Sequence, residues 1–244
     1  MTYNIILPVL NEELRLENGI LGIENFIEQH HKDNYHLTII DNGSTDSTWD
    51  LCCKFKNQYS NIDIYRIETR GVGAAIRAGV KHNQSDIVGY MDIDLSTELN
   101  ALSKMEHAFE TDASLKIVNA SRYNSDSILK GRTKLRNSIS YTLVALLKLV
   151  FKMKASDAIC GFKFFRKSTI EELLSESSQE PGWFLMIEVL LRAERKNMHI
   201  LELPVVWIYE KHTIVKVLRS LKGDREFLYQ RLKFKRLLYS YGIR

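Results

Sequence analysis

The chain has 244 residues, of which 45% are hydrophobic and 26% charged, with a formal net charge of +4. This length suffices for one large α/β domain with a sizeable core, and the composition excludes a disordered or fibrous protein. The positive charge is concentrated in residues 211–244, which hold ten Lys or Arg and two Asp or Glu, so the first 210 residues carry −4. We therefore predict one domain over residues 1–210 and a basic helical extension over residues 211–244.

The first half of the chain alternates between strand-like and helix-like segments. Apolar runs rich in β-branched residues predict strands at residues 3–7, 37–40, 62–67 and 86–91. Helical spacing predicts helices over residues 12–29, over residues 73–81, and from a cap at Ser44 or Thr45 to about Tyr59. Strands separated by helix-length segments favour right-handed crossovers and a mostly parallel sheet. The predicted fold class is therefore α/β, of the nucleotide-binding type.

The second half continues this pattern less regularly. Helices are expected over residues 99–109, 135–153 and 183–196, and strands over residues 115–120, 161–165 and 199–207. Residues 213–240 look helical and basic, with a ragged apolar stripe. Three cysteines without zinc-type spacing fit a reducing compartment. We see no signal peptide, and the apolar helix has at most 11 charge-free residues where a membrane span needs about 20. We expect a cytoplasmic protein.

Two aspartates, Asp92 and Asp94, come directly after the predicted strand 86–91. In an open α/β sheet, ligands bind at the edge where the strands end. Two carboxylates at i and i+2 can hold a hard divalent cation, and Mg²⁺ prefers a few carboxylates together with the phosphates of a substrate. The pair therefore suggests a metal-bridged diphosphate site, although a solvated loop would also carry such residues.

Three more loops are expected at the same edge, over residues 8–13, 41–46 and 70–73. Asp41 follows the second strand and can accept a hydrogen bond from a nucleotide base, or serve as a turn residue. Gly71 and Gly73 let the backbone approach a nucleotide closely, or mark a helix entry. Because the ends of parallel strands meet at one edge, the four loops together favour a single ligand site.

Seven motifs, in a fixed order, carry a resemblance to a known family. They read LPVLNEE, DNGSTDST, GVGAAIRAG, MDIDLST, ASRY, DAICGFKFFR and GWFLMIEVLLRAE. This series, over about residues 3–210, resembles the family 2 inverting glycosyltransferases of GT-A fold. It is most similar to the branch with dolichyl-phosphate mannose and glucose synthases and bacterial polyprenyl-phosphate sugar transferases. The resemblance implies a metal-dependent enzyme that uses Mg²⁺ or Mn²⁺ and a UDP- or GDP-linked sugar.

The resemblance also implies roles for individual residues. The donor is expected to contact Pro8, Asn11, Glu12, Asp41, Gly71, Gly73, Asp92, Arg122 and Arg136, with Asp41 reading the base. Asp92 and Asp94 match the metal-binding D-x-D, with Asp94 the direct ligand and Ser96 a further polar contact. Arg122 and either Arg132 or Arg136 resemble arginines that grip donor and acceptor phosphates, for which the planar guanidinium is suited. The candidate catalytic residues are Asp94, Arg132 and Glu188.

The clearest departure from the family lies at residues 183–188. Related sequences read W-x-F-D-x-E there, whereas this chain has Met186 in place of the aspartate. Transfer to a sugar hydroxyl needs a general base, whereas a phosphate acceptor is already anionic at neutral pH. The loss of the aspartate therefore favours a polyprenyl phosphate acceptor, with a hydroxyl of a surface polysaccharide or glycan as the alternative. Glu188 remains as a possible base, a phosphate-orienting group or an exposed helix residue.

The long apolar helix and the basic extension bear on partners. Lys148, Lys152 and Lys154 accompany the apolar helix, so it either lies at a membrane interface or packs in the core with solvated lysines. We expect membrane contact to be peripheral or through a partner protein. Nucleic-acid binding is not expected, because the extension has no recognised RNA-binding motif. A nucleotidyltransferase would want a different first loop, and a non-catalytic nucleotide-sugar-binding protein remains conceivable because of Met186.

Overall fold

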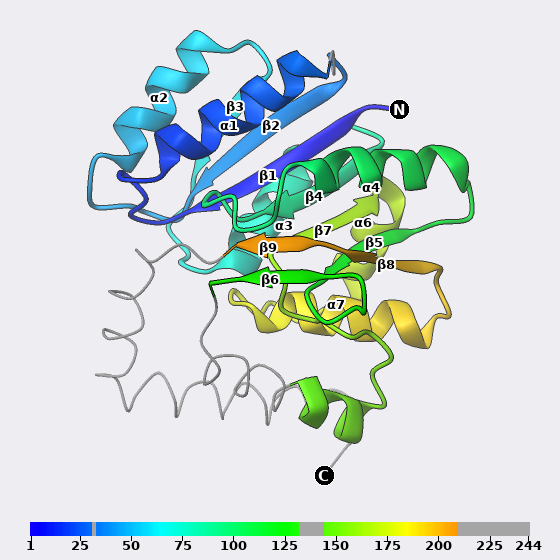
Figure 1. Cartoon of the computed structure of the whole chain (residues 1–244). Coiled ribbons are helices and arrows are strands. Elements are labelled where there is room, and N and C mark those ends of the chain that lie inside the picture. Colours follow the sequence, from blue (N-terminus) through cyan, green and yellow to red (C-terminus); the bar gives the residue numbers. More distant parts are fainter. Residues whose placement is uncertain (31–32, 132–143, 209–244) are drawn as a thin grey trace. The chain divides into compact units, whose positions relative to one another are not determined.

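The computed structural model describes residues 1–30, 33–131 and 144–208, all within one compact unit that spans Met1–Ile208 (Figure 1). The predicted helix 135–153 is described from residue 144 onward, and residues 144–151 are helical. The predicted basic extension, residues 211–244, lies outside the described residues. No helix in the described part of the chain is long and apolar enough to cross a membrane.

A seven-stranded sheet in the order β3-β2-β1-β4-β7-β5-β8 forms the centre of the unit. Its strands are β1 (Tyr3–Val9), β2 (Tyr35–Asp41), β3 (Ile62–Arg66), β4 (Ile87–Met91), β5 (Ile117–Ser121), β7 (Phe162–Arg166) and β8 (Ile200–Pro204). Only β7 among them runs antiparallel to its neighbours, β4 and β5. This confirms the predicted mostly parallel α/β sheet.

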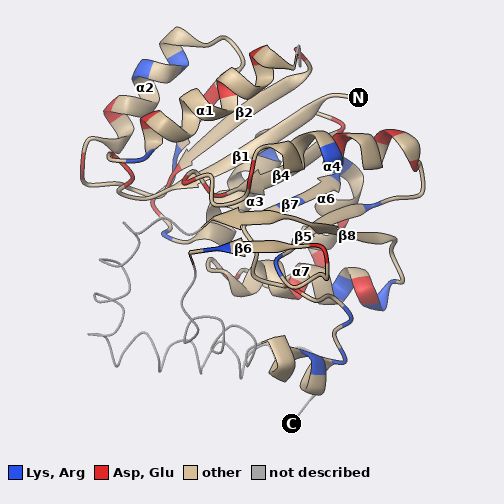
Figure 2. Ribbon diagram, in the orientation of Figure 1, with Lys and Arg blue, Asp and Glu red and all other residues tan. Residues whose placement is uncertain are grey.

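Helices cover both faces of this sheet (Figure 1). On one face, α1 (Leu16–Gln29), α2 (Thr48–Gln58) and α4 (Asn100–Thr111) share a core with the side chains of Ile5 and Leu7. On the other face, α3 (Val72–His82), α6 (Lys167–Glu176) and α7 (Phe184–Arg195) contact one another, and Gly79 of α3 packs on Ile6. Because β1 is buried on both faces, it reads as a continuous apolar run rather than an alternating one. Figure 2 shows the charged residues mostly on helices and loops.

Several predicted boundaries were wrong. Helix α1 begins at Leu16 rather than residue 12, because the Glu12 backbone N–H donates to Thr48 Oγ1 and residues 12–15 form a turn. Helix α2 begins at Thr48, after the expected caps at Ser44 and Thr45. Helix α6 was missed altogether, since it follows β7 without an intervening loop.

The predicted last strand, residues 199–207, is in fact two strands in two different sheets. β8 pairs with β5 up to Pro204, and β9 (Val206–Ile208) pairs with β6 (Ile128–Lys130) in a separate two-stranded ribbon. Pro204 has no backbone N–H to donate to a ladder, which makes it a natural end for β8. The β6–β9 ribbon was not predicted.

Candidate functional site

The loops that follow β1 and β2 are bound to each other by side-chain hydrogen bonds. Ser44 Oγ accepts from the backbone N–H of Asn11 at 2.9 Å, and Asn11 Oδ1 accepts from the backbone N–H of Thr45 at 2.8 Å. Asn11 can make this exchange because it adopts a left-handed backbone conformation, with φ of 54°, which asparagine tolerates better than most residues. The predicted donor residues Pro8, Asn11 and Glu12 therefore lie beside Asp41, as expected for one edge of a parallel sheet.

Asp41, the predicted base reader, is fully buried at the end of β2. Its carboxylate accepts a hydrogen bond from the Ser44 backbone N–H at 3.1 Å and pairs with Arg66 Nε at 3.0 Å. The Arg66 guanidinium also lies over the Trp49 ring, 5.4 Å from its centroid. Asp41 thus fixes the shape of the loop and holds Arg66 in place, so a base would meet this carboxylate together with its arginine.

Gly71 and Gly73 have a structural use that the sequence did not reveal. An ideal Cβ on Gly71 would lie 2.1 Å from the Pro181 carbonyl oxygen, and one on Gly73 would lie 2.6 Å from that of Gly182. Gly71 also has φ of 141°, which favours glycine. The Ala74 backbone N–H donates to the same Pro181 oxygen at 3.0 Å. The two glycines therefore make room for the segment 180–182, which is brought against the third loop.

Asp92 and Asp94 follow β4 and differ in their surroundings. Asp92 lies against the start of β7, where its backbone N–H donates to the Gly161 carbonyl at 3.1 Å. Burial and the nearby Asp94 charge raise the pKa of Asp92 to about 7. The Asp94 side chain is 18% exposed, accepts from the Ser96 backbone N–H at 3.0 Å, and has Arg15 Nη1 at 3.6 Å. Both side chains are partly exposed, but Asp92 packs against Gly161 whereas Asp94 contacts Arg15.

This donor set fits a divalent cation bound with a diphosphate. The raised pKa of Asp92 reflects negative charge that its own surroundings compensate poorly, and a cation would compensate it. Among the described residues, no three His, Cys, Asp or Glu side chains form a metal-binding group by themselves. Asp92 and Asp94 would therefore supply part of the coordination shell, and oxygens from substrate and water the rest, as Mg²⁺ prefers.

Arg122, expected to grip a phosphate, makes a buried ion pair. Its Nε and Nη2 atoms lie 2.7 and 3.0 Å from the two carboxylate oxygens of Asp157, and its backbone N–H donates to the same group. The guanidinium also lies over the rings of Tyr123 and Trp207. Arg132 and Arg136, the other predicted phosphate contacts, lie outside the described residues. Arg122 therefore helps to stabilise the structure next to the loop that carries Asp92 and Asp94.

Asp157 and Lys163 lie in the motif DAICGFKFFR, but no role was predicted for either residue. Lys163 is fully buried in β7, donates to the Cys160 carbonyl, and lies over the Tyr90 ring. Burial lowers the pKa of Lys163. The available signal was a lysine in the middle of the apolar strand Phe162–Arg166, a place where an unpaired charge is costly. Lys163 and Arg122 both draw the pKa of Asp92 down, against the effect of burial.

Met186 and Glu188 occupy the first turns of α7. Met186 is fully buried, and the Glu188 side chain is 2% exposed. The Glu188 carboxylate accepts hydrogen bonds from the Ser178 backbone N–H at 3.1 Å and from Arg192 at 2.7 Å. It also accepts from the Ser178 hydroxyl. Glu188 therefore anchors the chain just before the segment 180–182 that packs on Gly71 and Gly73.

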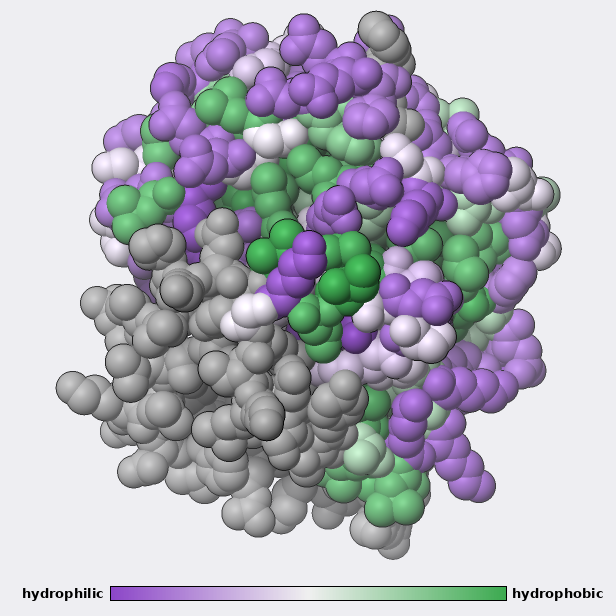
Figure 3. All heavy atoms as spheres, in the orientation of Figure 1, coloured by the Kyte–Doolittle hydropathy of each residue, from purple (hydrophilic) through white to green (hydrophobic). Residues whose placement is uncertain are grey.

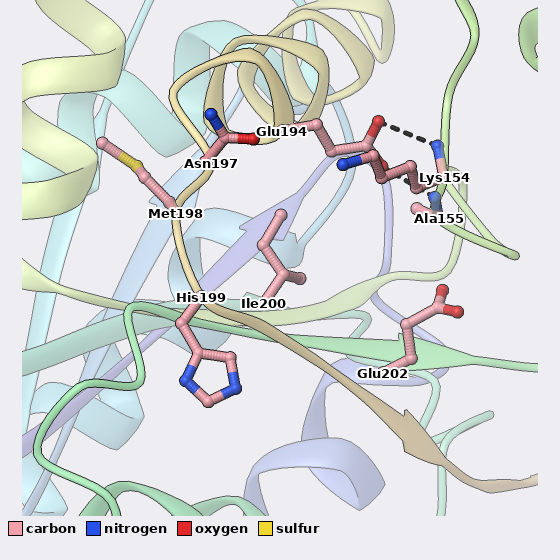
Figure 4. Close-up of a pocket in the computed structure, with 8 residues that line it drawn as sticks. All are labelled: Lys154, Ala155, Glu194, Asn197, Met198, His199, Ile200 and Glu202. Carbon is pink, nitrogen blue, oxygen red and sulfur yellow. Dashed lines mark hydrogen bonds between the residues drawn. The ribbon is translucent and has the colours of Figure 1, made fainter.

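A pocket of about 330 Å³ lies elsewhere, where α7 ends and β8 begins (Figure 4). Its wall includes Glu194, which accepts from the backbone N–H groups of Lys154 at 2.9 Å and Ala155 at 2.7 Å. None of the predicted site residues lines it. The pocket is therefore separate from the edge where Asp41 and Asp92 lie.

The chain is 26% identical over 258 residues to the dolichyl-phosphate beta-glucosyltransferase of Saccharomyces cerevisiae, covering 98% of this chain and 75% of that protein. It is 30% identical to the enzyme of the same name from Dictyostelium discoideum, covering 84% of this chain and 65% of the relative. The chain thus spans about two thirds to three quarters of the length of these relatives.

Among solved structures, the chain is similar to glucosyl-3-phosphoglycerate synthase from Mycobacterium tuberculosis, in a complex with Mn²⁺, UDP and glucosyl-3-phosphoglycerate. The TM-score is 0.60 at 18% identity, covering 84% of this chain and 70% of that one, which shows a shared GT-A fold. The family model for glycosyl transferase family 2 matches residues 4–174. This chain therefore belongs to glycosyl transferase family 2.

Proposed function

We propose that the protein is an inverting glycosyltransferase that moves a sugar from a UDP- or GDP-linked donor to a polyprenyl phosphate. The observation that carries the proposal is the setting of Asp92 and Asp94, two partly exposed carboxylates beside the loop that Asn11 and Ser44 hold together. A Mg²⁺ or Mn²⁺ ion at this pair would neutralise charge that develops on the leaving diphosphate. The names of the yeast and Dictyostelium relatives support the same class of acceptor.

The environment of α7 favours a phosphate over a hydroxyl acceptor. A general base must reach the proton that it removes, within hydrogen-bond distance. Met186 has no basic group, and the Glu188 carboxylate already accepts from Ser178 and Arg192 in a buried position. An acceptor phosphate oxygen is anionic without help. It forms the new bond to the anomeric carbon while the bond to the diphosphate breaks, and the electron pair leaves with the nucleoside diphosphate.

In this proposal Glu188 is an orienting residue that fixes the segment 180–182. Arg15 keeps the carboxylate of Asp94 in place, because it lies between Asp94 and Glu12 and pairs with both. Arg132 and Arg136 are proposed as the phosphate contacts, since the other candidate, Arg122, is occupied by Asp157. These roles divide the site into a donor edge after β1, β2 and β4 and an acceptor side near α7.

Membrane association is proposed to be peripheral. In the helical residues 144–151, Leu149 is 81% exposed and Leu146 is 40% exposed, and Lys148 is exposed beside them. Exposed leucines with lysines around them suit a surface that meets acyl chains and anionic head groups. We further propose that residues 1–210 form the transferase domain and that the basic residues 211–244 add to this attraction.

A transfer assay with the full chain tests the proposal. Labelled UDP-glucose or GDP-mannose, undecaprenyl phosphate and Mn²⁺ should give an organic-soluble product that mild acid hydrolyses. Asp94→Asn should lower turnover at least about a hundredfold, because charge stabilisation of the leaving group is lost. The control is Asp50→Asn, an exposed aspartate on α2, which should leave turnover unchanged. Label confined to water-soluble glycan would favour the hydroxyl acceptor, and binding of nucleotide sugar with no turnover would favour a binding protein.

A further inference from the structure

The β6–β9 ribbon presents an apolar face to the outside. Alternate residues of a strand share a face, and the register pairs Ile128 with Val206 and Lys130 with Ile208. These four residues therefore lie on one side of the ribbon. Ile128 is 51% exposed and Ile208 is 42% exposed, and Lys130 is also exposed. Figure 3 shows apolar side chains gathered over β6 and β9 on the face turned to the viewer.

Backbone hydrogen bonds fix this ribbon to the loop that carries the acidic pair. The Ile208 N–H donates to the Ser96 carbonyl at 2.8 Å, and the Glu98 N–H donates to the Val206 carbonyl at 3.1 Å. Ser96 itself donates from its backbone N–H to Asp94 Oδ1 at 3.0 Å. Ser96 therefore links the backbone of the exposed Ile208 to the carboxylate of Asp94.

The opposite face of the ribbon contacts the rest of the domain. Trp207 and Leu129 point to that side, and the Trp207 ring receives the Arg122 guanidinium at 5.6 Å from its centroid. The Ser127 hydroxyl, just before β6, donates to the Ser121 carbonyl at 2.6 Å. A two-stranded ribbon is marginal by itself, so these contacts are what keep its apolar face in place.

We propose that this face binds the isoprenoid units nearest the phosphate of the acceptor lipid, an inference that rests on the proposed function. A polyprenyl phosphate must bring its anionic group to the donor edge while its hydrocarbon chain leaves across an apolar surface. Ile128, Val206 and Ile208 supply such a surface beside Asp94, which removes hydrocarbon from water. Lys130 lies among them, and its ammonium can meet the lipid phosphate while its stem covers apolar atoms.

The first test uses Ile208→Thr and Ile128→Thr, because threonine keeps the β-branched shape and removes apolar surface. Each variant should raise the KM for undecaprenyl phosphate about fivefold, and the double variant more. The dissociation constant for UDP with Mn²⁺, measured by calorimetry, should not change, which also reports that the variant is folded. Asp50→Asn, the exposed aspartate on α2, should behave as the original protein does. Leu149→Thr, on the helical residues 144–151, is the matched comparison.

The second test does not depend on turnover. A polyprenyl phosphate with a photoreactive diazirine in its first isoprene units should label peptides that contain Ile128 or Ile208. Labelling only around Leu146 and Leu149, or a KM that rises in Leu149→Thr but not in the ribbon variants, would overturn the inference and place the lipid on the helix. If the unmodified chain neither transfers sugar to the lipid nor is labelled by it, the proposed function fails instead.

Discussion

Gly161 and Asp92 are in such close contact that no side chain fits between them. An ideal Cβ on Gly161 would lie 2.0 Å from Asp92 Oδ2, and the Gly161 carbonyl accepts from the Asp92 backbone N–H at 3.1 Å. The backbone just before β7 thus supports the Asp92 carboxylate directly. This contact explains why a glycine precedes the strand Phe162–Arg166.

Gly161→Ala should therefore displace Asp92. Overpacking of this kind costs about 1–3 kcal/mol in stability, because either the carboxylate or the backbone of β7 must move. We expect the Mn²⁺ concentration for half-maximal turnover to rise at least about tenfold. The neighbouring Cys160→Ala variant controls for a general loss of packing, since Cys160 is buried but does not support Asp92 in this way. Equal effects of the two variants on the Mn²⁺ requirement would contradict the prediction.

Binding of Mn²⁺ should strengthen as the pH rises from 6 to 8. Burial and the Asp94 charge raise the pKa of Asp92 to about 7, and a carboxylate must lose its proton to bind a metal. The raised pKa also means that the folded metal-free protein holds a proton that the unfolded chain releases near pH 4. Its contribution to stability is therefore present at low pH and is lost as the pH rises through about 7.

Calorimetric titration of Mn²⁺ with UDP at several pH values measures this effect. The Asp92→Asn variant is the control, because it has no titrating group at this position and its weaker binding should vary less between pH 6 and 8. Thermal unfolding without metal should show the opposite trend in the original protein, with stability falling as the pH rises from about 4 to about 7 and changing little above that. An affinity for Mn²⁺ that is independent of pH in the original protein would contradict the raised pKa.

The buried pair of Arg122 and Asp157 should make the protein sensitive to acid. Burial raises the pKa of Asp157, but the hydrogen bonds and charge of Arg122 more than offset this and leave that pKa below its ordinary value. A lowered carboxyl pKa gives stability that is present above the unfolded value and is lost as the pH falls through the folded one. Asp157→Asn should cost about 3–5 kcal/mol near pH 7, since it leaves a buried guanidinium without its counter-charge.

Denaturant unfolding between pH 2.5 and 7 checks this prediction. Part of the acid-induced loss of stability should disappear in Asp157→Asn, because the group that takes up the proton is gone. Asp126→Asn, an exposed aspartate near β6, serves as the control and should follow the original protein at every pH. If Asp157→Asn and the original protein lose stability in parallel as the pH falls, Asp157 does not titrate as proposed.

The donor edge was predictable because local patterns encode it. Asp41 and Asp92 each follow a short apolar run, and strand ends in a parallel sheet converge whatever the details of the loops. The Arg122–Asp157 pair was not predictable, since its partners are 35 positions apart and nothing local states which carboxylate an arginine will meet. The antiparallel direction of β7 was missed for a similar reason, because strand direction depends on the path of the preceding chain.

Gly71 and Gly73 illustrate a different limit. The helix-entry interpretation is confirmed, because Gly71 caps α3 and Gly73 lies in its first turn, and the backbone of Pro181 and Gly182 lies against both glycines. A glycine pattern predicts a close contact with the backbone but does not identify the group that makes it. The division of residues 199–207 into β8 and β9 had a signal in Pro204, which ends a ladder for lack of an N–H.

The Glu188→Gln variant distinguishes an orienting role of Glu188 from a role as general base. As an orienting residue it holds Ser178, so Glu188→Gln should keep kcat within about fivefold and cost about 1–3 kcal/mol in stability through weakened hydrogen bonds. Loss of a general base would instead lower kcat about a hundredfold or more.

Ser178→Ala is the matched variant, because it removes the Ser178 hydroxyl from the same carboxylate and leaves the Glu188 carboxylate in place. We expect both variants to raise the KM for the acceptor to a similar extent. Steady-state kinetics at several pH values measure this KM and the pH profile of kcat and kcat/KM. A large fall in kcat in Glu188→Gln alone, together with loss of one limb of that profile, would assign Glu188 to proton removal and restore the hydroxyl acceptor.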